Sequence, residues 1–190
     1  MKVSGYVKQY GYSLLAVLAL MSVCPSAARA QDVHKHAQTS PGSLITIVRE
    51  STARFRDVSV AERENYQLLF GCVSGSDFGA MGLHFVNLEL VGDDVLDPTR
   101  PEIVIYEPTP DGRLRLIGAD YLVFADTWHA KHAETPELMG QLLHLFESPN
   151  RFGLPAFYTL HVWAWKENPN GAFVNWHPKV SCDAFTPSNP

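Results

Sequence analysis

The sequence lacks the motifs that identify most catalytic and nucleotide-binding sites. It contains no G-x-S-x-G, H-E-x-x-H, C-x-x-C or G-x-G-x-x-G pattern and no phosphate-binding loop, so none of the corresponding reaction classes can be assigned from it. Basic residues are also few, with 15 Lys and Arg against 20 Asp and Glu, and they form no cluster. An acidic chain without a basic patch is not expected to bind nucleic acid or an anionic membrane surface.

Long apolar runs are scarce, and the only one lies at the N-terminus. Lys2 and Lys8 precede the run SLLAVLALMSV, and Ala28-Arg29-Ala30 has the small-x-small pattern that signal peptidase cleaves. We therefore predict a signal peptide over residues 1–30 and a periplasmic or secreted protein. Its removal would leave 12 basic and 20 acidic residues, a net charge of −8. No other run approaches the ~20 residues that span a bilayer, so no membrane association is expected after cleavage.

Cysteine is scarce as well, with three residues in the chain. Cys24 lies in the predicted signal peptide, which leaves Cys72 and Cys182 in the exported part. Because exported proteins mature in an oxidising compartment, we predict a disulfide between these two. It would close a loop of roughly 100 residues, which the chain-entropy model values on the order of 4–5 kcal/mol. The alternative, a thiolate metal or catalytic site, needs a nearby base or further sulfur ligands.

The rest of the chain has the composition of one domain. Residues 31–43 are polar and contain Pro, Gly and Ser, which predicts a flexible leader before a single globular domain over 44–190. Apolar residues at three- and four-residue steps predict helix between Leu44 and Phe70. A break is expected near Asp57, with a second helix start at the capping pattern from Ser59 to Glu62.

Strand patterns follow. The glycine-rich segment 71–82 predicts a loop leading into a strand at 83–90, and two β-rich runs around Asp111-Gly112 predict a hairpin over 102–124. Thr135-Pro136-Glu137 has the N-cap, proline and acid of a helix start. The apolar face of that helix would consist of Leu138, Leu142, Leu145 and Phe146. The fold class expected is α+β: an antiparallel sheet, open or barrel-like, with N-terminal helices and one helix inserted between strands.

One predicted strand combines aromatic side chains with an imidazole. The segment FYTLHVWAW (157–165) has no plainly polar face, so we expect a central strand covered on both sides. One face is aliphatic, whereas the other carries Thr159, His161 and Trp163 among further aromatics. Apolar walls with a few polar groups are typical of ligand pockets. The alternative is a structural histidine whose ring nitrogens are hydrogen-bonded within the core.

His84 is the natural partner of His161, because its same-face neighbours Ala80 and Gly82 are small and leave space before the ring. Two histidines from separate strands are candidate ligands of one divalent metal such as zinc, copper or iron. For a third ligand the hairpin offers Asp120.

Glu107 is the other carboxylate that the hairpin offers. A two-residue turn at 111–112 would pair Ile103 with Asp120 and Glu107 with Leu116, with Asp120 on the face of Leu116. The two carboxylates would then lie about 13 Å apart, so one metal cannot take both, and Glu107 is expected at the solvent end. Asp120 is therefore the preferred third ligand, although it could equally pair with a structural His or Arg.

The remaining histidines are weaker candidates. His129 and His132 have a helix-compatible spacing that, with Glu134, could hold zinc, but they lie in a polar connection where solvated histidines are common. The predicted leader contains two more, which could capture metal loosely. His177 follows the last predicted strand and could reach the same pocket.

Three stretches carry a resemblance: GAMGLHFVN (79–87), LDPTRPE (96–102) and GQLLHLFESPNRFGLPAFYTLHVWAWKENPNGAFVNWHPKVSC (140–182). They resemble a family of exported bacterial proteins that has no assigned activity, and the likeness covers roughly residues 70–183. It implies one exported domain that holds His84, His161 and Cys182 in recognisable motifs. The family has Asn where this chain has His177, and more often Glu where this chain has Asp120.

Together these patterns predict an exported protein that binds a divalent metal or a small ligand in a pocket formed by His84, His161, Trp163 and Asp120. One alternative is a hydrolase or isomerase in which an imidazole–carboxylate pair transfers a proton. The other is a non-catalytic envelope scaffold whose histidines are structural.

Overall fold

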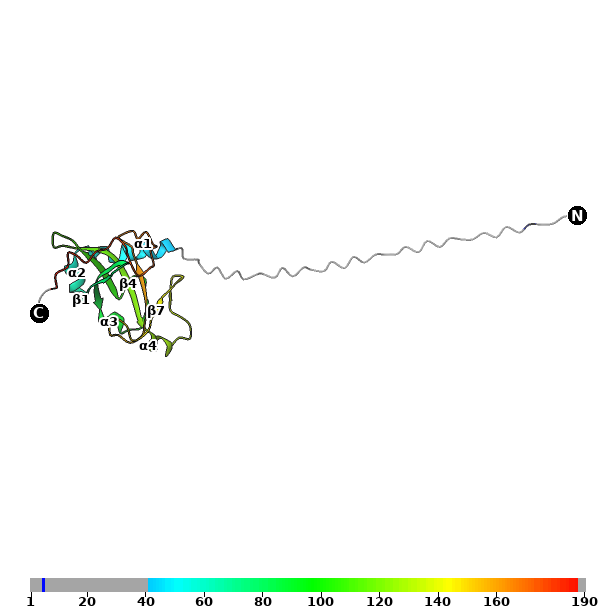
Figure 1. The fold of residues 1–190 in the computed structure, drawn as a ribbon. Coiled ribbons are helices and arrows are strands. Elements are labelled where there is room, and N and C mark those ends of the chain that lie inside the picture. Colours follow the sequence, from blue (N-terminus) through cyan, green and yellow to red (C-terminus); the bar gives the residue numbers. More distant parts are fainter. Residues whose placement is uncertain (1–4, 6–40, 188–190) are drawn as a thin grey trace. The chain divides into compact units, whose positions relative to one another are not determined.

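A computed structural model describes residue 5 and residues 41–187, and Figure 1 shows the arrangement of the elements. The helices are α1 (Pro41–Thr52), the 3-10 turn η1 (Ala53–Arg56), α2 (Val58–Arg63), α3 (Leu88–Val91) and α4 (Ala125–His129). The strands are β1 (Tyr66–Gly75), β2 (Gly79–Asn87), β3 (Ile103–Pro108), β4 (Leu114–Phe124), β5 (Glu137–Leu138), β6 (Gln141–Leu142), β7 (His144–Phe146) and β8 (Phe157–Val162). Within this part of the chain, no helix has the length and hydropathy of a membrane span.

Six strands form one antiparallel sheet in the order β1-β2-β3-β4-β8-β7, and the sheet curls into a half-barrel. β5 and β6 form a separate small hairpin. The predicted α+β class and its antiparallel sheet are confirmed. The hairpin expected around Asp111-Gly112 is also present, as β3 and β4.

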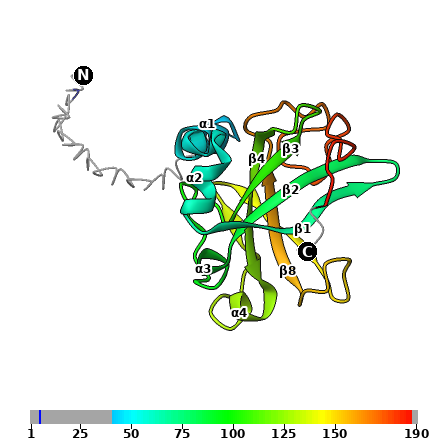
Figure 2. The same ribbon diagram turned by 90° about the vertical axis from the view of Figure 1, so that its left-hand side faces the viewer.

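The two faces of the sheet have different partners. On the outer face, Tyr121 and Leu160 pack against Leu44 and Val48 of α1, while η1 and α2 cover β2 and β3. Figure 2 shows α1 and α2 together on one side of the strands. The inner face carries a second apolar cluster that includes Leu122 and is completed by loops, by the C-terminal segment and, from the helices, by Val91 of the short α3. One face is thus sealed by helices, and the other is available for a pocket.

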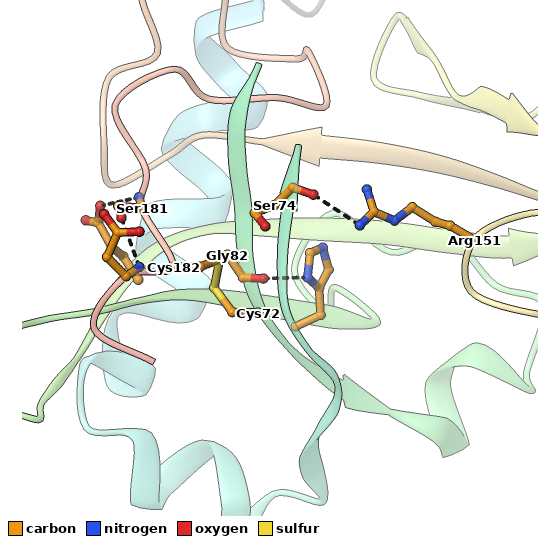
Figure 3. Close-up of a disulfide and its surroundings, with 9 residues drawn as sticks. Cys72, Ser74, Gly82, Arg151, Ser181 and Cys182 are labelled. Carbon is orange, nitrogen blue, oxygen red and sulfur yellow. Dashed lines mark hydrogen bonds between the residues drawn. A yellow bond between two sulfur atoms is a disulfide. The ribbon is translucent and has the colours of Figure 1, made fainter. Parts of the chain in front are cut away.

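The C-terminal segment is held to the sheet by the predicted disulfide. Cys72 of β1 bonds Cys182, with 5.7 Å between their Cα atoms, and Figure 3 shows the bond close to Gly82 of β2. The predicted signal peptide and Cys24 lie outside the described residues. Most of the predicted leader does too, but Pro41 already begins α1, three residues before the expected boundary.

The N-terminal helices end earlier than expected. The break near Asp57 is confirmed, and the Asp57 side chain itself caps α2 by accepting a hydrogen bond from the Ser59 amide. α2 ends at Arg63, and residues 66–75 form β1, where we predicted helix and then loop.

The prediction of a helix after Thr135 is wrong, because this segment forms β5, β6 and β7. Met139 and Gly140 both have positive φ, 51° and 83°, which matches the two-residue turns that join antiparallel strands. Such a turn cannot be continued as an α-helix. The expected apolar face does not exist either, since Leu142 and Leu145 are exposed while Leu138 is buried.

Candidate metal centre

Three potential ligands from three strands meet on the inner face of the sheet. His84 lies on β2, Asp120 on β4 and His161 on β8, and one ligand atom from each lies within 4.8 Å of the other two. The residues are 7%, 3% and 3% exposed. Among the residues that the structure describes, this is the group of His, Cys, Asp and Glu side chains with the geometry to hold a metal ion.

The curl of the sheet makes this meeting possible. β2 and β8 are separated by β3 and β4, and three strand spacings in a flat sheet would be about 14 Å. The Nε2 atoms of His84 and His161 are nevertheless 3.4 Å apart. Both imidazoles therefore point inward from opposite sides of the half-barrel.

A β-bulge turns Asp120 toward this centre. β3 pairs Ile105 with Gly118 but Tyr106 with Leu116, which leaves Ile117 as the extra residue. Leu116 packs in the outer cluster with Tyr106, whereas Asp120 lines the inner pocket. Positions four apart share a face in a regular strand, so the bulge moves Asp120 to the inner face.

The bulge also corrects our predicted register. Ile103 pairs with Asp120 as expected, but Glu107 pairs with Arg115 rather than with Leu116. The expectation that Asp120 shares a face with Leu116 is wrong for the same reason. Glu107 is not at the solvent end, since it is 6% exposed.

Gly82 orients the ring of His84. The Nδ1 atom of His84 lies 3.3 Å from the Gly82 carbonyl oxygen, and a carbonyl can only accept, so Nδ1 carries the proton and Nε2 presents a lone pair. Gly82 has a φ of +93°, and a Cβ at this position would lie 2.6 Å from the Tyr106 carbonyl oxygen. Glycine is therefore required for the backbone geometry that fixes this tautomer.

Asp120 has an equivalent effect on His161. The Asp120 Oδ1 atom is 3.4 Å from His161 Nδ1, and it accepts a 2.5 Å hydrogen bond from the Thr159 hydroxyl. The buried Nδ1 has no partner with hydrogen-bond geometry. Because a carboxylate repels a lone pair, it favours the tautomer with the proton on Nδ1. The Nε2 lone pairs of His84 and His161 then point into the same space.

Burial controls the charges of all three groups. It lowers the pKa of His84 to about 4 and that of His161 to about 3, and it raises the pKa of Asp120 to about 6. At neutral pH the centre consists of two neutral imidazoles and one carboxylate, which is the protonation state that metal ligation requires. Within residues 41–187, no lysine or arginine forms an ion pair with Asp120.

The separation of the ring nitrogens fits metal coordination. Two nitrogen ligands at about 2.0–2.1 Å from a tetrahedral zinc ion lie roughly 3.3–3.4 Å apart, and the observed Nε2–Nε2 distance is 3.4 Å. The distance between the two ring nitrogens therefore matches that between two ligands of one ion.

The three ligands lie at one end of an apolar pocket that contains about 410 Å³ of space between atoms, part of it open to solvent. Thr159 is the fourth polar residue of the lining. Four phenylalanines, which we call the aromatic collar, line the rest together with five aliphatic side chains. The collar is Phe70, Phe146, Phe152 and Phe157, and the aliphatic residues are Met81, Val86, Ile103, Leu122 and Leu154.

The other predicted residues lie elsewhere. Trp163 contacts the His161 ring, at 5.8 Å between centroids, but it is not part of the pocket lining. His177 is buried, with Nδ1 accepting from the Lys179 amide and Nε2 facing the Glu167 carbonyl, so both nitrogens are used structurally.

His129 and His132 do not converge on a site with Glu134. His129 Nε2 contacts the Tyr158 hydroxyl at 2.9 Å, and the His132 ring stacks on Trp128. Both histidines are exposed. His34 and His36 lie outside the described residues.

The collar was not identified from the sequence. Phe146 and Phe152 belong to a segment in which we expected a helix and a loop, and Phe70 to an expected helix end. The signal available was the density of phenylalanine in FESPNRFGLPAF, directly before the strand that carries His161.

Comparison with known proteins provides no assignment: no protein-family model, curated protein or solved structure matches the chain.

Proposed function

We propose that the protein binds one divalent transition-metal ion through His84, Asp120 and His161, with open coordination positions directed at the apolar pocket. The observation that carries this proposal is the 3.4 Å approach of two Nε2 atoms whose neighbours favour the tautomers with a lone pair at that position. Two imidazoles and a carboxylate suit zinc, copper or ferrous iron. Three protein ligands leave room for an exchangeable ligand, unlike closed structural sites.

Electrostatics supports the same proposal. Burial of a carboxylate without a cationic partner is unfavourable. Asp120 is 3% exposed and accepts hydrogen bonds from the Thr159 hydroxyl and from the backbone of Tyr121 and Leu160, but no lysine or arginine of the described residues pairs with it. A divalent cation would supply the missing positive charge.

Metal titration of protein purified without a histidine tag tests this proposal. After chelator treatment, we expect one Zn²⁺ or Co²⁺ to bind per chain, measured by calorimetry and elemental analysis. His84→Ala, His161→Ala and Asp120→Asn should each weaken binding by at least about 100-fold, because each removes a ligand.

His129→Ala is the matched control, since it removes an exposed histidine outside the centre, and it should bind metal like the wild type. Failure of the wild-type protein to bind a stoichiometric metal would refute the proposal. So would binding that is lost in His129→Ala but retained in the three centre variants.

A metal-independent hydrolase or isomerase is the second candidate. The observation in its favour is the series Thr159, Asp120 and His161, in which a hydroxyl and a carboxylate support an imidazole, the arrangement of a general base. An activity that persists in chelator and disappears in Asp120→Asn would favour it over the metal proposal.

We also propose that the protein acts in the periplasm or outside the cell. The Cys72–Cys182 disulfide is compatible with an oxidising compartment. Detection of the protein in the periplasmic or culture fraction, with residues 1–30 absent by mass spectrometry, would support this location.

A further inference from the structure

We infer that the open side of the metal centre takes a small monoanionic organic acid with an aromatic or branched apolar body. The head group would coordinate the metal, and the body would pack within the aromatic collar. This inference rests on the proposed metal site and adds the chemical class of its ligand.

Polar groups line the pocket only at the metal centre. All four polar lining residues belong to the metal centre or contact it, and the other nine lining residues are apolar. The Thr159 hydroxyl already donates to Asp120. A ligand therefore finds polar partners at one end only, so a sugar or a peptide with polar groups along its length would lose hydrogen bonds that the pocket cannot replace.

Charge balance sets the number of anionic groups. A divalent ion, the Asp120 carboxylate and two neutral imidazoles together carry a net charge of +1, which one anionic head group neutralises. A dianion would leave an excess negative charge at a buried centre, and no lysine or arginine is among the lining residues to compensate it. The centre therefore selects for a monoanion.

The pocket is also small. About 40 Å³ of it is enclosed cavity, and the wider space of about 410 Å³ between its atoms includes open solvent. The enclosed part has room for a small head group at the metal, so the apolar body of a ligand would lie in the open mouth against the collar.

The backbone of β1 directs one collar residue over the pocket. Phe70 and Gly71 have φ angles of 65° and 66° at the point where the pairing with β2 is interrupted. A bulky residue rarely adopts positive φ, and such bulges commonly re-aim a side chain next to a functional site. The Phe70 ring makes an edge contact with Phe152, with 5.6 Å between ring centroids, yet the residue is 50% exposed. An apolar ligand body would cover this exposed surface.

Co²⁺-loaded protein provides a direct test, because the visible absorption of Co²⁺ reports a change of its ligands. The probe is 3-phenylpropionate, compared with acetate, 3-phenylpropionamide and benzylmalonate. Acetate lacks the apolar body, 3-phenylpropionamide lacks the charge, and benzylmalonate carries a second charge. We expect 3-phenylpropionate to shift the spectrum and to bind at least about tenfold more tightly than each of the others.

Two collar variants locate the apolar body. Phe70→Gly removes the ring while keeping a residue suited to positive φ, and Phe152→Ala removes its partner. Each should weaken 3-phenylpropionate by about tenfold, the usual effect of losing one aromatic contact, and should leave acetate binding and Co²⁺ binding unchanged. Phe78→Ala is the control, because Phe78 is exposed and packs on Trp176 away from the pocket.

The experiment separates two kinds of failure. If Co²⁺ does not bind at all, the proposed metal site is refuted and the inference falls with it. If Co²⁺ binds but 3-phenylpropionate leaves the spectrum unchanged, binds no better than acetate or benzylmalonate, or is insensitive to Phe70→Gly, the inference alone is overturned.

Discussion

Glu107 and Asp120 lie on the two strands of one hairpin, and both are buried, but different groups surround them. Glu107 Oε1 is 2.6 Å from Lys166 Nζ, and Glu107 Oε2 is 2.6 Å from an Arg115 nitrogen. Asp120 accepts hydrogen bonds from the Thr159 hydroxyl and from the backbone of Tyr121 and Leu160, and the two imidazoles beside it are neutral at pH 7. The first carboxylate is thus compensated by cations of the fold, and the second is not.

Their pKa values differ accordingly. Burial acts to raise the pKa of Glu107, but the hydrogen bonds from Lys166 and Arg115 outweigh it, and the pKa lies below its usual value. For Asp120 burial prevails, and the pKa rises to about 6. A buried carboxylate without a lysine or arginine partner, beside two ring nitrogens, would be stabilised by the mobile cation that we propose.

Glu102 represents a third outcome. It is 1% exposed, its Oε2 accepts a hydrogen bond from the Leu122 amide, and its Oε1 has no partner. Burial raises the pKa of Glu102 to about 8, so the group holds a proton at neutral pH. The three acids are therefore neutralised by fixed cations, by a proton and, we propose, by a metal.

The largest effect is expected for Glu102→Gln, which should change how the free energy of unfolding depends on pH. The folded pKa of about 8 exceeds the usual value of 4.5, so between these pH values the folded state holds a proton that the unfolded chain has lost. The contribution of Glu102 is fully present below about pH 4.5 and is lost as pH rises through 8. By linkage the loss is on the order of 5 kcal/mol. Glutamine keeps the neutral shape, so the variant should be more stable than the wild type at pH 8.5 and equally stable at pH 4.5.

Denaturant unfolding across pH 4.5–9 in chelator measures this difference. Glu62→Gln changes an exposed glutamate and should follow the wild-type curve. Parallel curves for the wild type and Glu102→Gln would contradict a protonated Glu102.

A smaller loss of stability is expected for Glu107→Gln. The substitution leaves Lys166 and Arg115 without their partner, which costs about 3–5 kcal/mol for a fully buried pair. Here the two cationic side chains are 21% and 61% exposed and can turn toward water, so we expect about 2 kcal/mol.

The Glu107→Gln measurement is the free energy of unfolding at pH 7. Arg113→Ala, which removes an exposed ion pair with Asp111, is the control and should leave stability unchanged. Metal affinity should stay at the wild-type level, and a large loss of metal binding in Glu107→Gln would remove the distinction between the two carboxylates.

The sequence was sufficient for the sheet class, the disulfide and the approach of His84 to His161. These follow from local patterns: alternation in the strands, an Asp-Gly turn, and two cysteines in a predicted exported chain. The predicted pairing of Ile103 with Asp120 is present because two departures cancel: the turn closes with Thr109 opposite Arg113, one residue off the predicted register, and the bulge at Ile117 restores that register.

The bulge at Ile117 and the strands after Thr135 could not be predicted in the same way. A bulge depends on how β4 packs on both neighbours, and nothing in the local pattern marks the extra residue. The segment 136–146 has helix-forming leucines, but the pairing of β7 with β8 outweighs this helical preference. The collar was missed because Phe146 and Phe152 follow Thr135 in a segment expected to be helix and loop, and Phe70 lies in a strand expected to be a helix end.

The smallest expected effect has the opposite sign from that of Glu107→Gln and concerns Asp120→Asn in the metal-free protein. The substitution removes a buried charge that no lysine or arginine of the described chain compensates, and an amide oxygen can still accept from the Thr159 hydroxyl. At pH 7.5 in chelator we therefore expect stability to rise by about 1–2 kcal/mol, measured by thermal and denaturant unfolding. With saturating Zn²⁺ the order should reverse, because the wild type gains binding energy that the variant has lost. A variant that is less stable than the wild type even in chelator would mean that Asp120, like Glu107, serves the fold.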